Sequence, residues 1–157
     1  MAVELKQCIA LVATLGIGLL AGTLAGTGLA EFTARHLPEA SWTMRFQLED
    51  SLFARVMPPF MLSTLVALGV SSTLAQGSPR WLFGASVAFM LLVLAVTIVF
   101  EVPLNKQIQS WTPGSAPHTW QSIRDLWLRR HLLRTIAAIL SFISALLALM
   151  ASPGLRS

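Results

Sequence analysis

Five side chains that could bind or transform a ligand recur at helical spacing near the C-terminal end of the chain. They are Trp120, Arg124, Trp127, His131 and Arg134, at steps of four, three, four and three. This spacing places all five on one face of a single helix, which runs directly into a long apolar segment. Polar groups at membrane depth are costly unless they have partners or line a cavity. The pattern therefore predicts a polar pocket at the mouth of a membrane helix bundle.

The chemistry available on this face is acid–base and electrostatic. A histidine such as His131 can take or give a proton near neutral pH. The guanidinium groups of Arg124 and Arg134 stay charged and can stabilise an oxyanion or an enolate. The indoles of Trp120 and Trp127 form a flat apolar wall that suits an aromatic ligand. We therefore take His131 as the candidate base, the two arginines as its cationic partners and the two tryptophans as the substrate-binding surface.

Two further residues are candidate substrate-binding groups. Asn105 follows the third apolar run and could orient a substrate oxygen. Arg45 opens a second helical pattern, whose members are Arg45, Glu49, Leu52, Val56 and Pro59. Arg45 and Glu49 can pair at i,i+4. Since this pattern reaches the same membrane surface, we expect Arg45 or Glu49 to approach the stripe of side chains from Trp120 to Arg134.

A structural alternative remains for the charged residues of the stripe. Long cationic side chains near a membrane surface often reach out to lipid headgroups or pair with carboxylates. The carboxylates available for such pairing are Glu49, Asp50, Glu101 and Asp125. Because Arg124, His131 and Arg134 share a face with both tryptophans, the functional interpretation is favoured for them. Arg129 and Arg130 lie off that face, where contact with headgroups is the expected role.

Histidine spacing argues against a metal site. The three histidines, His36, His118 and His131, show no metal-binding spacing to one another or to a carboxylate. A di-iron bundle site would need a set of glutamates and Glu-x-x-His motifs on four helices. A haem needs only one axial histidine, and His131 is the only histidine at membrane depth. The cofactor is therefore left open between none, with direct O₂ chemistry, and a haem bound through His131.

Other function classes find no support in the residues. The chain has no GxSxG motif, and its single cysteine, Cys8, excludes an internal disulfide and a cysteine-pair metal site. The formal charge of +4 is dispersed through segments that flank apolar runs. Basic residues without clustering beside aromatic platforms do not indicate nucleic-acid binding. The expected partners are a lipophilic small molecule and membrane lipid.

Composition and hydropathy predict the fold class. The chain has 157 residues, of which 55% are hydrophobic and 11% charged. A helix needs about 20 apolar residues to cross a bilayer, and four runs qualify, at about 8–30, 52–74, 81–100 and 131–151. The first run is too long for the apolar core of a signal peptide. We predict one all-α domain over residues 1–157, an integral membrane four-helix bundle of the bacterial inner membrane whose long helices project beyond the bilayer on one side.

Prolines, caps and charges refine this topology. Ser41 can cap a helix that begins at Trp42, Pro58 and Pro59 predict a kink or break in the second span, and Pro103 predicts the end of the third. With four spans both chain ends lie on one side of the membrane. Lys6, Arg80 and Arg156 accompany the ends, whereas eight basic residues lie on the other side. Two long connectors join the first span to the second and the third span to the fourth. The positive-inside rule would place both of them in the cytoplasm.

Glycines recur on one face of the first span. Gly18, Gly22 and Gly26 form two overlapping GxxxG units. Such units let another backbone approach closely. We expect packing inside the bundle, with homo-oligomer contact or a wall of the pocket as alternatives.

The chain resembles the anthrone-oxygenase-like integral membrane family. The resemblance rests on residues 45–55, on Met57-Pro58-Pro59, and on Pro103, Leu104, Asn105, Trp111, Trp120, Arg124, Trp127, His131 and Arg134. It extends over nearly the whole chain and implies four spans and an oxygenase site. Fungal members of the family oxidise anthrones to anthraquinones. Gln47 stands where many relatives have histidine, which speaks against a mechanism with a pair of histidines.

Two functions remain open at this point. The first is a membrane-embedded oxygenase or oxidoreductase, such as a monooxygenase, that abstracts a proton from a lipophilic anthrone- or quinone-like aromatic molecule. The second is a non-catalytic membrane protein that binds haem through His131 or a lipid. An absorption spectrum separates them, because a haem would show a Soret band.

Overall fold

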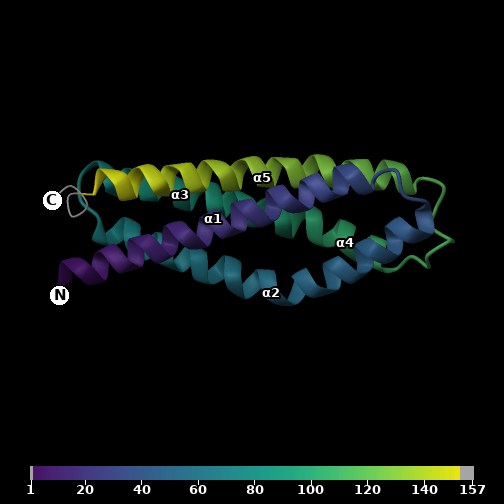
Figure 1. The fold of residues 1–157 in the computed structure, drawn as a ribbon, viewed down its shortest axis with the longest axis horizontal. Helices are drawn as coiled ribbons and strands as arrows, with labels where there is room; N and C mark the ends of the chain where they lie inside the picture. The colour runs from purple at the N-terminus through teal and green to yellow at the C-terminus, as the bar shows by residue number, and fades with distance from the viewer. Residues whose placement is uncertain (1, 153–157) are drawn as a thin grey trace.

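The protein is a bundle of four long helices. The computed structural model describes residues 2–152. Its elements are α1 (Ala2–Ala34), α2 (Glu39–Leu74), α3 (Ser78–Val96), the π-helical turn η1 (Thr97–Glu101), α4 (Val102–Gln109) and α5 (Trp120–Ala151). The described residues contain no strand. The predicted all-α class is therefore confirmed, and Figure 1 shows that α1 begins and α5 ends at the same end of the bundle.

Four helices are long and apolar enough to cross a membrane. They extend over Glu4–Ala34, Glu39–Leu74, Ser78–Gln109 and Trp120–Ala151, and each contains one of the four predicted apolar runs. Helices α2 and α5 begin well before their apolar runs, so the bundle continues beyond the bilayer at the end with the two long connectors. This arrangement indicates an integral membrane protein, as predicted.

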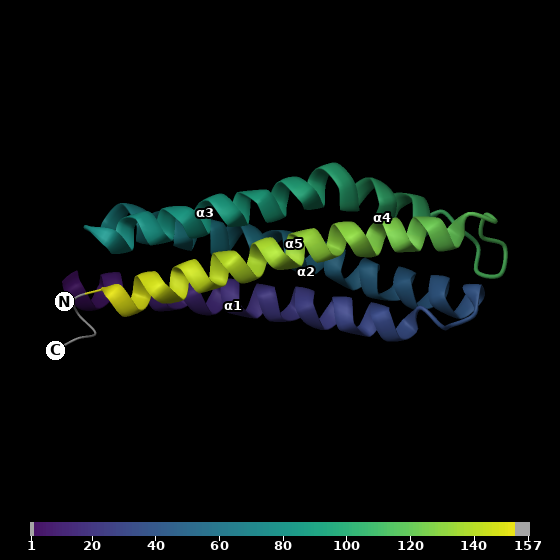
Figure 2. The same ribbon diagram turned by 90° about the horizontal axis from the view of Figure 1, so that it is seen from above.

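The third helix does not end at Pro103, contrary to the sequence-based expectation. The chain passes from α3 through η1 into α4 without leaving helical geometry. Figure 2 shows α3 and α4 as one continuous, bent helix beside α5. Pro103 lies in the first turn of α4, directly after the π-helical turn. A π turn widens the helix locally, which accommodates the proline ring that would otherwise meet the carbonyl four residues earlier. This turn also places Glu101 in the interior, where it is fully buried.

The start of α2 differs from the sequence-based prediction, whereas its bend at two prolines agrees with it. The helix begins at Glu39 after Pro38, and no side-chain cap bond is made, so the predicted start at Trp42 with Ser41 as the cap is wrong. Pro58 and Pro59 lie inside the helix without ending it. Figure 1 shows α2 bent near its middle, in agreement with the predicted kink.

Small residues allow the helices of the membrane part to approach closely. Helix α5 packs against α1 and α3 through fully buried alanines such as Ala13, Ala138 and Ala145. The Ser141 hydroxyl donates to the Ser86 carbonyl at 2.8 Å and joins α5 to α3. Such close packing and interhelical hydrogen bonds hold membrane helices together where lipid removes the hydrophobic driving force.

Aromatic residues pack the part of the bundle beyond the apolar runs. Trp42 is fully buried, and its ring lies 5.3 Å from that of Phe46 and 5.7 Å from that of Trp120. Trp42 therefore belongs to a second core rather than to an interfacial belt. Trp81, which is 77% exposed at the start of α3, fits the belt instead.

The glycine face of α1 divides into a packed and an open part. A Cβ at Gly18 would lie 2.9 Å from a ring carbon of Phe142 on α5, whereas one at Gly22 or Gly26 would meet nothing within 4 Å. We expect Gly18→Leu to lower the stability of the bundle by about 1–3 kcal/mol through overpacking. Gly22→Leu is the matched control and should unfold in detergent at the wild-type temperature. Equal unfolding temperatures for both variants would contradict this packing. Homo-oligomer contact through the open part stays a prediction. It would be supported if Gly22→Leu changed the mass of the protein particle in detergent.

Candidate functional site

A cavity of about 370 Å³ lies between α1, α2, η1–α4 and α5. Its deeper walls are apolar and include Leu20, Leu24, Phe53, Met57 and Met61. Its polar lining comprises Thr23, Thr27, Glu31, Glu49, Asp50, Thr97, Asn105, Lys106, Gln109, Trp127 and Arg134. Concave, mostly apolar sites with a few convergent polar groups are typical of small-molecule binding.

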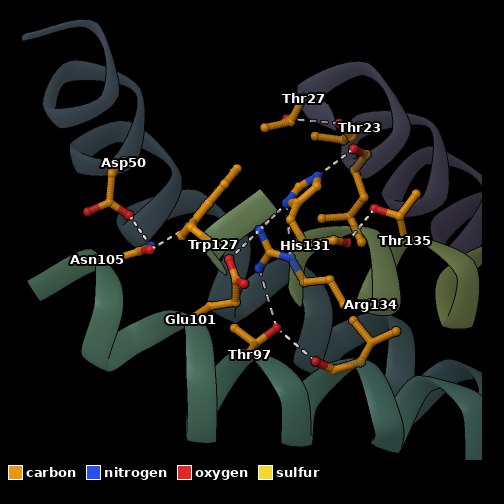
Figure 3. Close-up of polar contacts among 12 residues, drawn as sticks. Thr23, Thr27, Asp50, Thr97, Glu101, Asn105, Trp127, His131, Arg134 and Thr135 are labelled. Carbon is orange, nitrogen blue, oxygen red and sulfur yellow. Dashed lines mark hydrogen bonds and ion pairs between the residues drawn. The ribbon is translucent and has the colours of Figure 1, made fainter. Parts of the chain in front are cut away.

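Arg134 lies at the centre of a buried polar cluster in the wall of this cavity. Its Nη2 atom is 2.8 Å from Nδ1 of His131 and 3.5 Å from Oε2 of Glu101, and its Nη1 atom is 3.5 Å from Oγ1 of Thr97. Figure 3 shows the guanidinium group between the carboxyl group of Glu101 and the ring of His131. A guanidinium has five N–H donors, so Arg134 retains donor capacity for an oxygen atom in the cavity that it lines.

Both ring nitrogens of His131 are engaged. An arginine can only donate, so Nδ1 must accept the bond from Arg134 and Nε2 must carry the proton. Nε2 then donates to the carbonyl oxygen of Leu24 on α1 at 2.8 Å. His131 is only 1% exposed and does not line the cavity. In this arrangement the histidine holds Arg134 in place and ties α5 to α1.

An axial haem ligand does not fit this arrangement. Ligation of iron requires a ring nitrogen with a free lone pair. The lone pair of His131 faces Arg134, and neither of the other two histidines lines the cavity. Among the described residues there is also no group of three histidine, cysteine, aspartate or glutamate side chains that could hold a metal ion. His131, with both ring nitrogens engaged, is therefore not available as a haem ligand in this structure.

A second polar chain leads from Trp127 toward α2. Trp127 is 4% exposed, stacks on the His131 ring with centroids 4.7 Å apart, and donates from Nε1 to Oδ1 of Asn105 at 2.8 Å. Asn105 in turn donates from Nδ2 to Oδ1 of Asp50 at 2.5 Å. The indole is therefore fixed in orientation by a ring and by an amide. Two predicted substrate-binding residues, Asn105 and Trp127, meet at the cavity.

A family model for anthrone oxygenase matches residues 50–144. The chain belongs to the anthrone oxygenase family. No curated protein and no solved structure matches it. The matched segment contains the cluster around Arg134 and the chain from Trp127 to Asp50, whereas α1, which supplies the facing wall with Leu20 and Leu24, lies outside it.

Some predicted site residues line this cavity and others lie outside it. Arg124 and Trp120 lie outside its lining. Arg124 is 7% exposed, donates to the Arg35 carbonyl at 2.9 Å and to Asp125 at 2.9 Å, and places its guanidinium 5.1 Å from the centre of the Trp120 ring. These contacts connect α5 to the segment after α1. The stripe thus faces the bundle as expected, and its two ends lie in different environments.

Arg45 binds two carboxylates that line the cavity. It binds Glu31 through Nη2 and Glu49 through Nη1, the latter at 2.7 Å. The Trp42 indole also donates to Glu31, which is 2% exposed. Arg45 itself is not part of the lining, but Glu49 faces the same cavity as Trp127. Gln47 donates to the carbonyls of Ile108 at 3.0 Å and Trp111 at 2.9 Å, so it joins α2 to the end of α4 rather than facing a ligand.

Sequence reasoning missed two buried carboxylates, Glu31 and Glu101, as parts of the site. Glu31 lies just outside the predicted apolar run over residues 8–30, and the sequence indicates Glu101 only as a pairing partner for the arginines. A signal was present in their positions, because each is the first residue after a predicted apolar run. A charge at that depth needs a partner, and each carboxylate has an arginine in the structure.

Proposed function

We propose that the protein is a membrane-embedded oxygenase for a lipophilic aromatic substrate of the anthrone or quinone-like class. One observation carries the proposal: the lining of a cavity with apolar walls contains the largely buried guanidinium of Arg134 and the oriented indole of Trp127. The family match supports the reaction type. A lipophilic aromatic ketone would bury its rings against the apolar walls and direct its oxygen to Arg134.

The reaction can proceed without a cofactor. Loss of a proton from the acidic C–H group of an anthrone leaves the electron pair on the substrate as an enolate, an electron-rich anion that O₂ can oxidise. Addition of O₂ at this carbon forms a C–O bond and gives a hydroperoxide after protonation. Loss of the second C–H proton with cleavage of the O–O bond then forms the carbonyl and releases water. Anthrone and O₂ are thus converted to anthraquinone and water.

The chain's own residues would serve three needs of this chemistry. Arg134 would stabilise the negative charge that develops on the substrate oxygen, because a cation held in place beside apolar walls interacts strongly with such a charge. Trp127 and Asn105 would hold the ring plane and orient a substituent. The proton acceptor must lie beside Arg134, where His131 and Glu101 are the two candidates. His131 can act as the base predicted from the sequence only if Arg134 releases Nδ1 as it turns to the substrate.

Binding of a stable aromatic anion tests the proposal. A hydroxyanthraquinone resembles the product, cannot undergo this oxidation, and changes its visible spectrum when its hydroxyl group ionises. We expect purified protein in detergent to bind it as the anion at a pH at which the free compound is neutral. Trp127→Phe should weaken binding by about tenfold, because it removes the indole area and the bond to Asn105. Trp81→Phe, an exposed tryptophan outside the cavity, is the control, and an equal effect of both substitutions would contradict the proposal.

We further propose that the protein resides in the bacterial inner membrane with its two long connectors in the cytoplasm. The four apolar helices and the uneven distribution of basic residues support this proposal. Labelling of a cysteine placed in the connector at Ser115 should then require a permeant reagent in intact cells. Labelling by an impermeant reagent would reverse the orientation.

A further inference from the structure

The carboxyl group of Glu101 is a buried acceptor in the cluster around Arg134. Its residue is 0% exposed, and neither side-chain oxygen has a hydrogen-bond partner within the described part of the chain. Its contact with Arg134 Nη2, at 3.5 Å, is an ion pair without a hydrogen bond. A buried polar group without hydrogen bonds requires an explanation in a native structure.

The other possible proton acceptors near the cavity already accept hydrogen bonds. Nδ1 of His131 accepts from Arg134, at 2.8 Å from Nη2. Among the lining carboxylates, Glu31 accepts from Trp42 and Arg45, Glu49 accepts from Arg45 at 2.7 Å, and Asp50 accepts from Asn105 at 2.5 Å. Protonation of any of these groups would weaken the hydrogen bonds that its present form accepts. Glu101 would lose none.

Arg134 links Glu101 to the cavity. Glu101, like His131, is not itself part of the lining, but the guanidinium that it contacts is, and so are Thr97 and Val102 on η1 and α4. Figure 3 shows the Glu101 carboxyl group directed toward this guanidinium. A substrate anion in the cavity would therefore compete with Glu101 for the same cation. Two negative charges sharing one buried guanidinium leave an excess charge away from water, which is strongly disfavoured.

We propose that Glu101 receives the proton of the substrate and is replaced by the substrate anion as the counter-ion of Arg134. This inference rests on the proposed function. In the step, the substrate C–H or O–H bond breaks, its electron pair remains on the substrate, and the proton forms an O–H bond with Glu101. Before the step Arg134 is paired with a carboxylate and the substrate is neutral. After it Arg134 is paired with the substrate anion and Glu101 is neutral, so the net charge of the buried site does not change.

Counting protons tests this exchange. The hydroxyanthraquinone probe is added to weakly buffered protein with a pH indicator, and anion formation is followed in the visible spectrum. Wild-type protein should bind the anion and release no proton, and an infrared difference spectrum should show a new protonated carboxyl band. Glu101→Gln should still bind the anion but release about one proton per bound probe, because the internal acceptor is gone. The carboxyl band should be absent from this variant.

Three further variants make the outcome decisive. Glu101→Asp retains a carboxylate and should behave as wild type. Asp125→Asn removes a carboxylate outside the cavity lining, and its proton count should also be that of wild type. If proton release appears in His131→Gln rather than in Glu101→Gln, the histidine is the acceptor and the inference is wrong. It is also wrong if the wild-type protein itself releases the proton. If the visible spectrum of the probe does not change with wild-type protein, the proposed binding function fails first.

Discussion

Arg134→Lys is expected to lower anthrone turnover by about 100- to 1,000-fold, the usual effect of removing one electrostatic partner of a developing oxyanion. Arg134 contacts His131, Glu101 and Thr97 while it lines the cavity. A lysine keeps the charge but lacks the planar set of donors needed to reach these groups and a substrate oxygen together. Turnover is measured as quinone formation in detergent, together with the unfolding temperature.

Lysine is the informative replacement because the charge must stay. Arg134→Ala would leave Glu101 buried without a counter-ion, which typically destabilises a protein by about 3–5 kcal/mol. Arg124→Lys is the matched control, since Arg124 lies on the same helix face but outside the cavity lining. It should retain turnover. The account fails if Arg134→Lys turns over at the wild-type rate, or if Arg124→Lys loses as much.

His131→Ala is expected to lower turnover by about 100-fold, because it releases Arg134, and a small misplacement of a catalytic group has effects of this size. His131→Gln separates positioning from base catalysis. The glutamine amide can accept a bond from Arg134 through its oxygen and donate to the Leu24 carbonyl through its nitrogen. We therefore expect His131→Gln to recover most of the turnover lost in His131→Ala.

The same pair of variants also examines the two alternatives for His131. A glutamine cannot serve as a general base or as an axial haem ligand of the expected strength. If His131→Gln is as inactive as His131→Ala, the base assignment made from the sequence is favoured over the positioning role. A Soret band in the wild-type protein that is lost in both variants would overturn the cofactor-free chemistry.

The fold and the buried face of α5 could be predicted because both follow from periodicity. Four apolar runs of spanning length leave few alternatives to a helix bundle. Steps of three and four residues correctly indicated that Arg124, Trp127 and His131 face the interior. The face from Trp120 to Arg134 is about 21 Å long at 1.5 Å per residue. Its two ends therefore reach different surroundings, and periodicity along one helix cannot show which end borders a cavity.

The position of the buried carboxylates could not be predicted because it depends on tertiary contacts. Pro103 suggested that the third helix ends, and nothing in the local sequence specifies the π-helical turn that carries the chain past it. That turn brings Glu101 to Arg134. Glu31 continues α1 beyond the apolar run because Trp42 and Arg45 of α2 bind its carboxylate. The partners of Glu31 and Glu101 lie on other helices, so helix propensity alone could not show that either carboxylate is buried.

The central claim is that this cavity supports oxidation of an aromatic substrate by O₂ without a metal or haem. Its most direct test is turnover of an anthrone by the purified, chelator-treated protein under isotopically labelled O₂, with mass spectrometry of the quinone. We predict equimolar consumption of O₂ and formation of quinone, with one labelled oxygen in the new carbonyl group and a rate well above that of spontaneous oxidation. A rate no faster than the spontaneous reaction, or a new carbonyl oxygen derived from water, would contradict the account.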